Sequence, residues 1–86
     1  MISWNIYHRY QTPVITNADT AQQVSQLMLD ISEQLNQSIF LVQDRVTAEE
    51  LALYRRAVGR IMGEILLEVL NPLYQEHPEL KPDGLD

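Results

Sequence analysis

The longest hydrophobic pattern in the chain runs from Thr47 to about Glu76 and has the period of an α-helix. Placed at about 100° per residue, its apolar side chains fall on one arc roughly 180° wide. A single partner helix covers a stripe nearer to about 100°. The pattern therefore predicts a helix with at least two neighbours. The arc consists of Leu51, Tyr54, Val58, Ile61, Met62, Ile65, Leu66, Val69, Leu70 and Leu73.

The start of this helix carries two capping signals. Thr47 and Glu50 have the spacing of a capping box, in which each side chain accepts a hydrogen bond from the other residue's backbone N–H. Val46 and Leu51 flank the cap and are spaced to close over it as a hydrophobic staple. Both signals predict a helix that begins near residue 47.

The end of the helix is marked by Pro72, which removes one helical hydrogen bond and clashes with the carbonyl four residues earlier. Because Leu73 continues the apolar arc, we expect a kink near Pro72, after which the helix resumes to about residue 76. The alternative is a break in which Asn71 caps a new turn. Residues 78–86 are rich in proline and acidic side chains, and we expect a flexible or extended acidic tail.

A second helical pattern spans residues 17–44 and starts at Asn17, a favoured N-cap residue. Its apolar stripe is only about 100° wide, which suits one main neighbour. Leu29 and Phe40 fall outside the stripe on nearly the same bearing. They are either a smaller second contact or scattered surface residues. The stripe consists of Val24, Leu27, Met28, Ile31, Leu35, Ile39 and Val42.

Residues 1–16 precede both helices. From Ile2 to Tyr10 the side chains alternate and are rich in aromatic and β-branched types, a pattern typical of a strand. Pro13 ends the pattern. An isolated strand of this length is not stable by itself, so it either pairs across a dimer or lies as an extended arm with Trp4 against the helices. We favour the arm.

The connection from Asp44 to Thr47 is so short that the two helices, residues 17–77 in all, must form an antiparallel hairpin. A hairpin in an 86-residue chain without cysteine encloses little core. Gly59 and Gly63, four positions apart, favour a close helix–helix approach over surface glycines that are merely tolerated. We therefore predict an all-α hairpin that dimerises into a four-helix bundle. The expected interface residues are Trp4, Val58, Gly59, Met62, Gly63, Leu66 and Leu70.

The composition narrows the partners and the location. The formal net charge of −6 repels phosphate backbones, which argues against nucleic-acid binding. No run approaches the roughly 18 apolar residues of a membrane helix, and the N-terminus lacks a signal-peptide pattern. Together with the lack of cysteine, these features predict a cytoplasmic protein with neither a membrane nor a nucleic acid as partner.

No motif for catalysis, a cofactor or a metal emerges. His8 and His77 share no motif with carboxylates at ligand spacing, and they fit solvated or capping histidines better than metal ligands. Glu64 and Glu68 lie on the polar side of their helix and lack the Glu-x-x-His pairs of carboxylate-bridged metal sites. We therefore predict a protein that is not an enzyme, with no cofactor and no metal site.

Arg55, Arg56 and Arg60 form the one cationic cluster, with Arg55 inside the apolar arc. Arg56 and Arg60 share a helix face that suits a phosphate, a carboxylate or an acidic segment of a partner protein. Acidic residues outnumber basic ones by twelve to six, so pairing within the protein or across subunits is the favoured expectation. The candidate carboxylates for that pairing are Asp30, Asp44, Glu49 and Glu64.

These observations favour a small helical interaction or regulatory module that acts as a homodimer and presents its surfaces to another protein. The alternative is a bundle that binds a small anionic ligand near Arg55, Arg56 and Arg60 at the subunit interface. A DNA-binding dimer with a paired N-terminal ribbon has the right order of elements. The ribbon would carry Arg9 as its one basic residue, so we disfavour that function.

Overall fold

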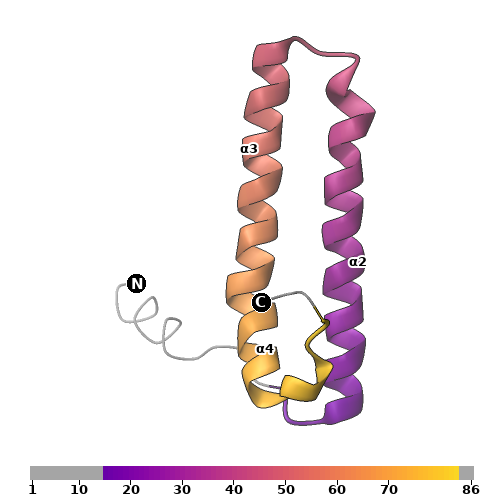
Figure 1. The fold of residues 1–86 in the computed structure, drawn as a ribbon, viewed down its shortest axis with the longest axis vertical. Helices are drawn as coiled ribbons and strands as arrows, with labels where there is room; N and C mark the ends of the chain where they lie inside the picture. Colours follow the sequence, from indigo (N-terminus) through magenta and orange to yellow (C-terminus); the bar gives the residue numbers. More distant parts are fainter. Residues whose placement is uncertain (1–14, 84–86) are drawn as a thin grey trace, which may run out of the picture.

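The structure is a computed structural model that describes residues 15–83, and these residues form an antiparallel helical hairpin (Figure 1). Helix α2, Ala18–Gln43, is followed by α3, Ala48–Glu64. A π-helical segment, η1, Ile65–Leu70, continues α3 directly into α4, Asn71–Glu76. A 3-10 turn, η2, Pro78–Leu80, is the last element of the described residues. The predicted all-α hairpin is confirmed, and no strand occurs within residues 15–83.

Both predicted helix starts are confirmed by their caps. The Asn17 side chain accepts a hydrogen bond of 2.9 Å from the backbone N–H of Thr20. Thr47 and Glu50 form the complete capping box: the Glu50 N–H donates to the Thr47 hydroxyl at 3.1 Å, and the Thr47 N–H donates to the Glu50 carboxylate at 2.9 Å. These side chains satisfy N–H groups that have no partner inside the helix, so they fix where each helix begins.

Pro72 ends neither the helix nor its apolar face. The backbone stays in the right-handed helical region through Leu70 and Asn71, and the predicted resumption of the helix is confirmed. The irregularity lies before the proline, in η1, where the Asn71 N–H donates to the carbonyl of Leu66, five residues earlier. The wider π turn accommodates a proline that an α-helix would accept only with a clash.

The π segment also rotates α4 toward the core. In a regular α-helix Tyr74 would stand about 160° around the axis from Val58. Yet the two side chains are only 6% and 2% exposed, respectively. Six π-helical residues turn by roughly 20° less each, because a π turn holds about 4.4 residues. This difference brings Tyr74 back to the side that faces α2.

The core lies at the open end of the hairpin, opposite the turn that joins α2 and α3. Its buried members are Ala21 of α2, Leu70 of η1 and Leu73 and Tyr74 of α4. Two hydroxyl pairs link α2 to the returning helix: Ser25 with Tyr74 at 2.6 Å, and Ser38 with Tyr54 at 2.7 Å. Partly buried residues pack around the core, namely Ile15, Val24, Met28, Leu29, Ile65, Leu66 and Leu80.

The start of the predicted tail differs from the expectation. Pro78–Leu80 forms a 3-10 turn, and Leu80 packs against the core cluster, so this part is folded onto the hairpin rather than extended. Leu80 lies between two prolines, and burying its apolar side chain against the core is favourable. The acidic composition of the segment gave no sign of this contact. Of the predicted arm, Ile15 packs against the same cluster. Residues 1–14, which include Trp4, and residues 84–86 lie outside the described part.

Candidate self-association surface

The hairpin leaves most of its apolar surface incompletely covered. Within residues 15–83, five hydrophobic side chains are buried: Ala21, Val58, Leu70, Leu73 and Tyr74. The other members of the predicted α3 arc are partly buried or exposed, and Ile61 is 49% exposed. One neighbouring helix therefore does not cover the arc, as its width of about 180° indicates.

An apolar groove of about 290 Å³ lies on one face of the hairpin, and we call it the central groove. Helix α2 contributes one wall, and α3 with η1 contributes the other. Met62 lies 14 residues after the start of α3 and Leu29 lies 14 residues before the end of α2, so the groove sits near the middle of the hairpin. Its lining consists of Leu29, Ser32, Met62, Gly63, Leu66 and Leu70.

Gly59 and Gly63 do not mediate the close approach of α2 that their spacing suggests. Apart from its chain neighbours and the backbone of its own helix, a Cβ atom built on either glycine meets no heavy atom of the described residues within 4 Å. The missing side chains therefore leave open space rather than a tight contact inside the hairpin. Gly63 opens onto the central groove, where a Cβ-free surface allows an approaching helix to come close.

The predicted interface residues that lie within residues 15–83 divide into three groups. Met62, Gly63, Leu66 and Leu70 come together in the central groove. Val58 is 2% exposed, so its prediction as an interface residue is corrected: it packs inside the hairpin and has no free surface to offer. Gly59 is exposed. Leu29 and Ser32 of α2 also line the groove, and the sequence pattern did not place them with these residues.

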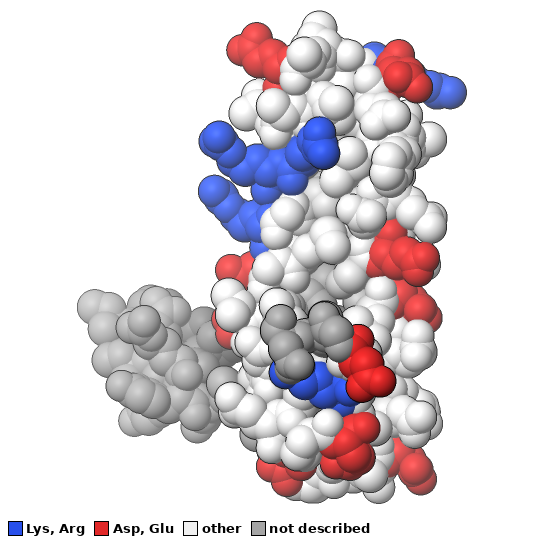
Figure 2. Space-filling view, viewed as in Figure 1, with Lys and Arg blue, Asp and Glu red and all other residues white. Residues whose placement is uncertain are grey.

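The arginine cluster, Arg55, Arg56 and Arg60, is exposed on α3 near the turn end of the hairpin. Figure 2 shows the blue side chains grouped on the flank of the molecule formed by α3. None of the three forms an ion pair with a carboxylate of residues 15–83, so the pairing expected with Asp30, Asp44, Glu49 or Glu64 is absent within the described chain. The cluster keeps its charge available to an anionic group.

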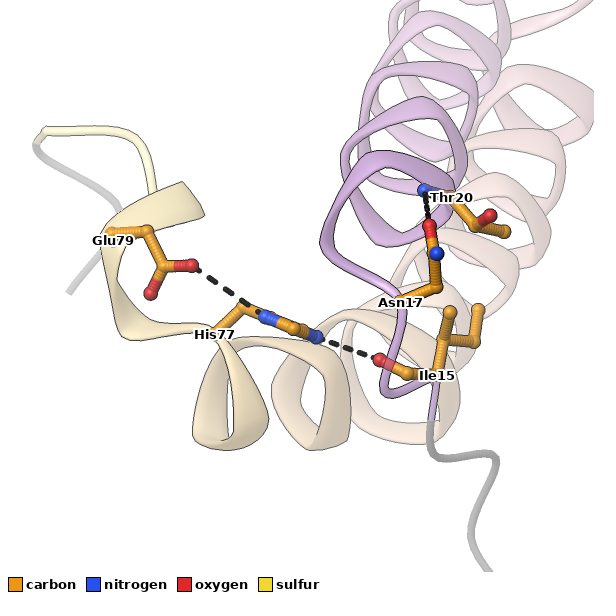
Figure 3. A network of polar contacts seen from close by, with 5 residues as sticks. All are labelled: Ile15, Asn17, Thr20, His77 and Glu79. Carbon is orange, nitrogen blue, oxygen red and sulfur yellow. Dashed lines mark hydrogen bonds and ion pairs between the residues drawn. The ribbon is translucent and has the colours of Figure 1, made fainter.

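His77 is a structural residue at the junction of the two chain ends. It is 8% exposed, so of the two expected roles, solvated or capping, the solvated one is wrong. Its Nε2 donates to the carbonyl of Ile15 at 2.7 Å, and its Nδ1 lies 3.5 Å from the Glu79 carboxylate (Figure 3). His77 also occupies the C-cap of α4. The imidazole thus holds the segment before α2 against the end of α4.

The rest of the described surface offers little chemistry. A second hollow of about 290 Å³ lies at the open end and is lined by Asn71, Tyr74, Gln75, Pro78 and Lys81. Residues 15–83 contain no group of three or more histidine, cysteine and acidic side chains placed to hold a metal ion. None of the helices formed by these residues is sufficiently long and apolar to cross a membrane.

Comparisons with protein-family models, curated proteins and solved structures found no match for this chain.

Proposed function

We propose that this protein is a non-enzymatic helical interaction module that acts as a homodimer, with the central groove at the dimer interface. The observation that carries the proposal is an open apolar groove at the middle of a hairpin that buries few hydrophobic side chains. Removing such surface from water contributes about 25 cal/mol for each Å². A second copy supplies an equally long apolar face, and two hairpins together form a four-helix bundle.

The geometry of the groove supports a helix as its occupant. Gly63 lowers one wall, while Met62 and Leu66 provide flexible and branched apolar contacts beside it. Helices that pack at 8–10 Å between axes need such low points for the ridges of a partner. In the dimer, Arg56 and Arg60 then remain exposed as a surface for an acidic segment of another protein.

Sedimentation equilibrium across protein concentrations from about 1 to 100 μM tests the dimer. We expect a mass of twice 10.0 kDa at the upper end. We also expect a melting temperature that rises with protein concentration, because association stabilises the folded state by mass action. A monomer throughout this range, with a concentration-independent melting temperature, would contradict the proposal.

A second candidate function is the binding of a small anionic ligand by the arginine cluster. It is favoured by Arg56 and Arg60, which are exposed and form no ion pair with a carboxylate of residues 15–83. For a Kd of about 1 mM, phosphate or citrate at 10 mM should raise the free energy of unfolding by about 1.4 kcal/mol. For a domain of this size, that corresponds to several degrees in melting temperature.

The control compares Arg56→Ala/Arg60→Ala with Arg45→Ala, which removes an exposed arginine in the turn. The double variant should lose the thermal shift, and the single variant should keep it. Sodium chloride at matched ionic strength corrects for general screening. A shift of equal size with chloride, or in the double variant, would rule out a specific anion site.

A further inference from the structure

Charge is distributed unevenly along the hairpin. The turn half, residues 31–60, carries four acidic and four basic side chains and is neutral overall, and it includes the arginine cluster. The open half, residues 15–30 and 61–83, carries seven acidic side chains and one lysine. The formal charge of −6 of the described chain therefore lies entirely in the open half.

The central groove marks the boundary between the two halves. Leu29 and Met62 face each other across it at about 21 Å from the turn, in a hairpin roughly 40 Å long. A two-fold axis through this groove therefore maps each half of one copy onto a half of the other. Two arrangements result, one with the turns at the same end and one with the turns at opposite ends.

We infer that the second copy docks on the central groove in the antiparallel arrangement, with the two turns at opposite ends of the bundle. This inference rests on the proposed dimer. With the turns at the same end, two open halves, each of charge −6, would lie side by side. With the turns at opposite ends, each open half lies beside a neutral half whose three clustered arginines have no ion pair within residues 15–83. Helix axes about 10 Å apart exceed the Debye length of about 8 Å at physiological salt, so the electrostatic preference should be largest at low ionic strength.

Local positions agree with this orientation. Arg55 lies seven residues before Met62, two turns along the same helix face, and so borders the central groove on the turn side. Rotation about the groove therefore places Arg55 of one copy beside the acidic open half of the second copy.

Distances between spin labels distinguish the two arrangements, and the chain has no native cysteine to interfere. Gln43→Cys places a label at the exposed end of α2 beside the turn, and Gln22→Cys places one near the open end. Neither substitution changes the charge. In the antiparallel dimer Gln43→Cys, about 21 Å from the groove, should give a distance of about 40 Å or more, whereas with the turns at the same end it should give one below about 25 Å, the width of the bundle. Gln22→Cys, only about 10 Å from the groove, should give about 20–30 Å in the antiparallel dimer. In a mixture of the two labelled proteins, part of the long Gln43→Cys distance should be replaced by one below about 25 Å.

The outcomes separate this inference from the proposed function. A dimer that gives a short distance for Gln43→Cys alone would overturn the antiparallel orientation and leave the dimer intact. A monomeric protein without dipolar coupling would overturn both.

Arg55→Glu/Arg56→Glu/Arg60→Glu gives the turn half a charge of −6 as well. In this variant, labelled at position 43, we expect a short-distance population beside the long one. If the single long distance persists, charge does not set the orientation.

Discussion

Replacing Met62 with glutamate should convert the dimer into a folded monomer and raise the dissociation constant by roughly 10²–10⁴-fold. Met62 lines the middle of the central groove and is only partly buried by its own chain. A two-fold interface loses the burial of this side chain twice, about 1.5–3 kcal/mol each time, and each 1.4 kcal/mol is about a factor of ten in affinity. The new carboxylates would also meet near the two-fold axis, where like charges repel.

Leu53→Glu is the matched control, because Leu53 belongs to the same helix, is 60% exposed and does not line the groove. It introduces the same charge and a residue of similar helix propensity. Sedimentation at about 50 μM should give a monomer for Met62→Glu and a dimer for Leu53→Glu. Circular dichroism should show helix in both. If Met62→Glu still dimerised as tightly as the control, the interface would not be the central groove.

The helix positions were predictable from the sequence because their signals are local. Asn17 and the Thr47–Glu50 pair satisfy backbone groups within three residues of themselves, so their spacing carries the full information. The short connection after Asp44 likewise determines the antiparallel direction of α3. These features depend on no contact with a distant part of the chain.

The features that could not be predicted from the sequence are contacts between residues far apart in the chain. A helical wheel with a constant 100° step puts Tyr74 on the edge of the arc, whereas η1 turns it inward onto Ser25, 49 positions away. The helix-end position of His77 was visible in the sequence, but its hydrogen bond to the carbonyl of Ile15, 62 positions away, was not. Leu80 sits in an acidic, proline-rich segment, and its packing against the core follows only from the three-dimensional fold.

The candidate surface was predictable only in part, because one of its two walls depends on the packing of α2 against α3. The width of the α3 arc indicated surplus apolar surface, and four of the expected interface residues do line the central groove. The wheel did not separate residues facing α2 from residues flanking it, so Val58 was assigned to the interface although it is buried inside the hairpin. Leu29 belongs to the opposite wall. Its position depends on how α2 is rotated about its own axis, and the hydrophobic pattern of α3 gives no information about that rotation.

Replacing Leu73 with alanine should lower the free energy of unfolding by about 2–5 kcal/mol, the usual cost of a leucine-to-alanine change in a core. Leu73 is 1% exposed and is the largest fully buried side chain of the described residues. It packs with Ala21, Leu70 and Tyr74 in the cluster that joins α2 to the end of the returning helix. A chain of this length has a total stability on the order of 4–13 kcal/mol, so this loss removes a large part of it.

The measurement is thermal or urea unfolding at one fixed protein concentration, because association contributes to the apparent stability. The melting temperature should fall by roughly 10–30 °C. Leu41→Ala, at a position that is 67% exposed on α2, makes the same chemical change outside the core and should alter the stability by at most about 0.5 kcal/mol. Equal losses for the two variants would mean that the open end does not hold the core of the hairpin. A large loss confined to Leu73→Ala would show that the packing of α4, brought about by the π segment, holds the two ends of the chain together.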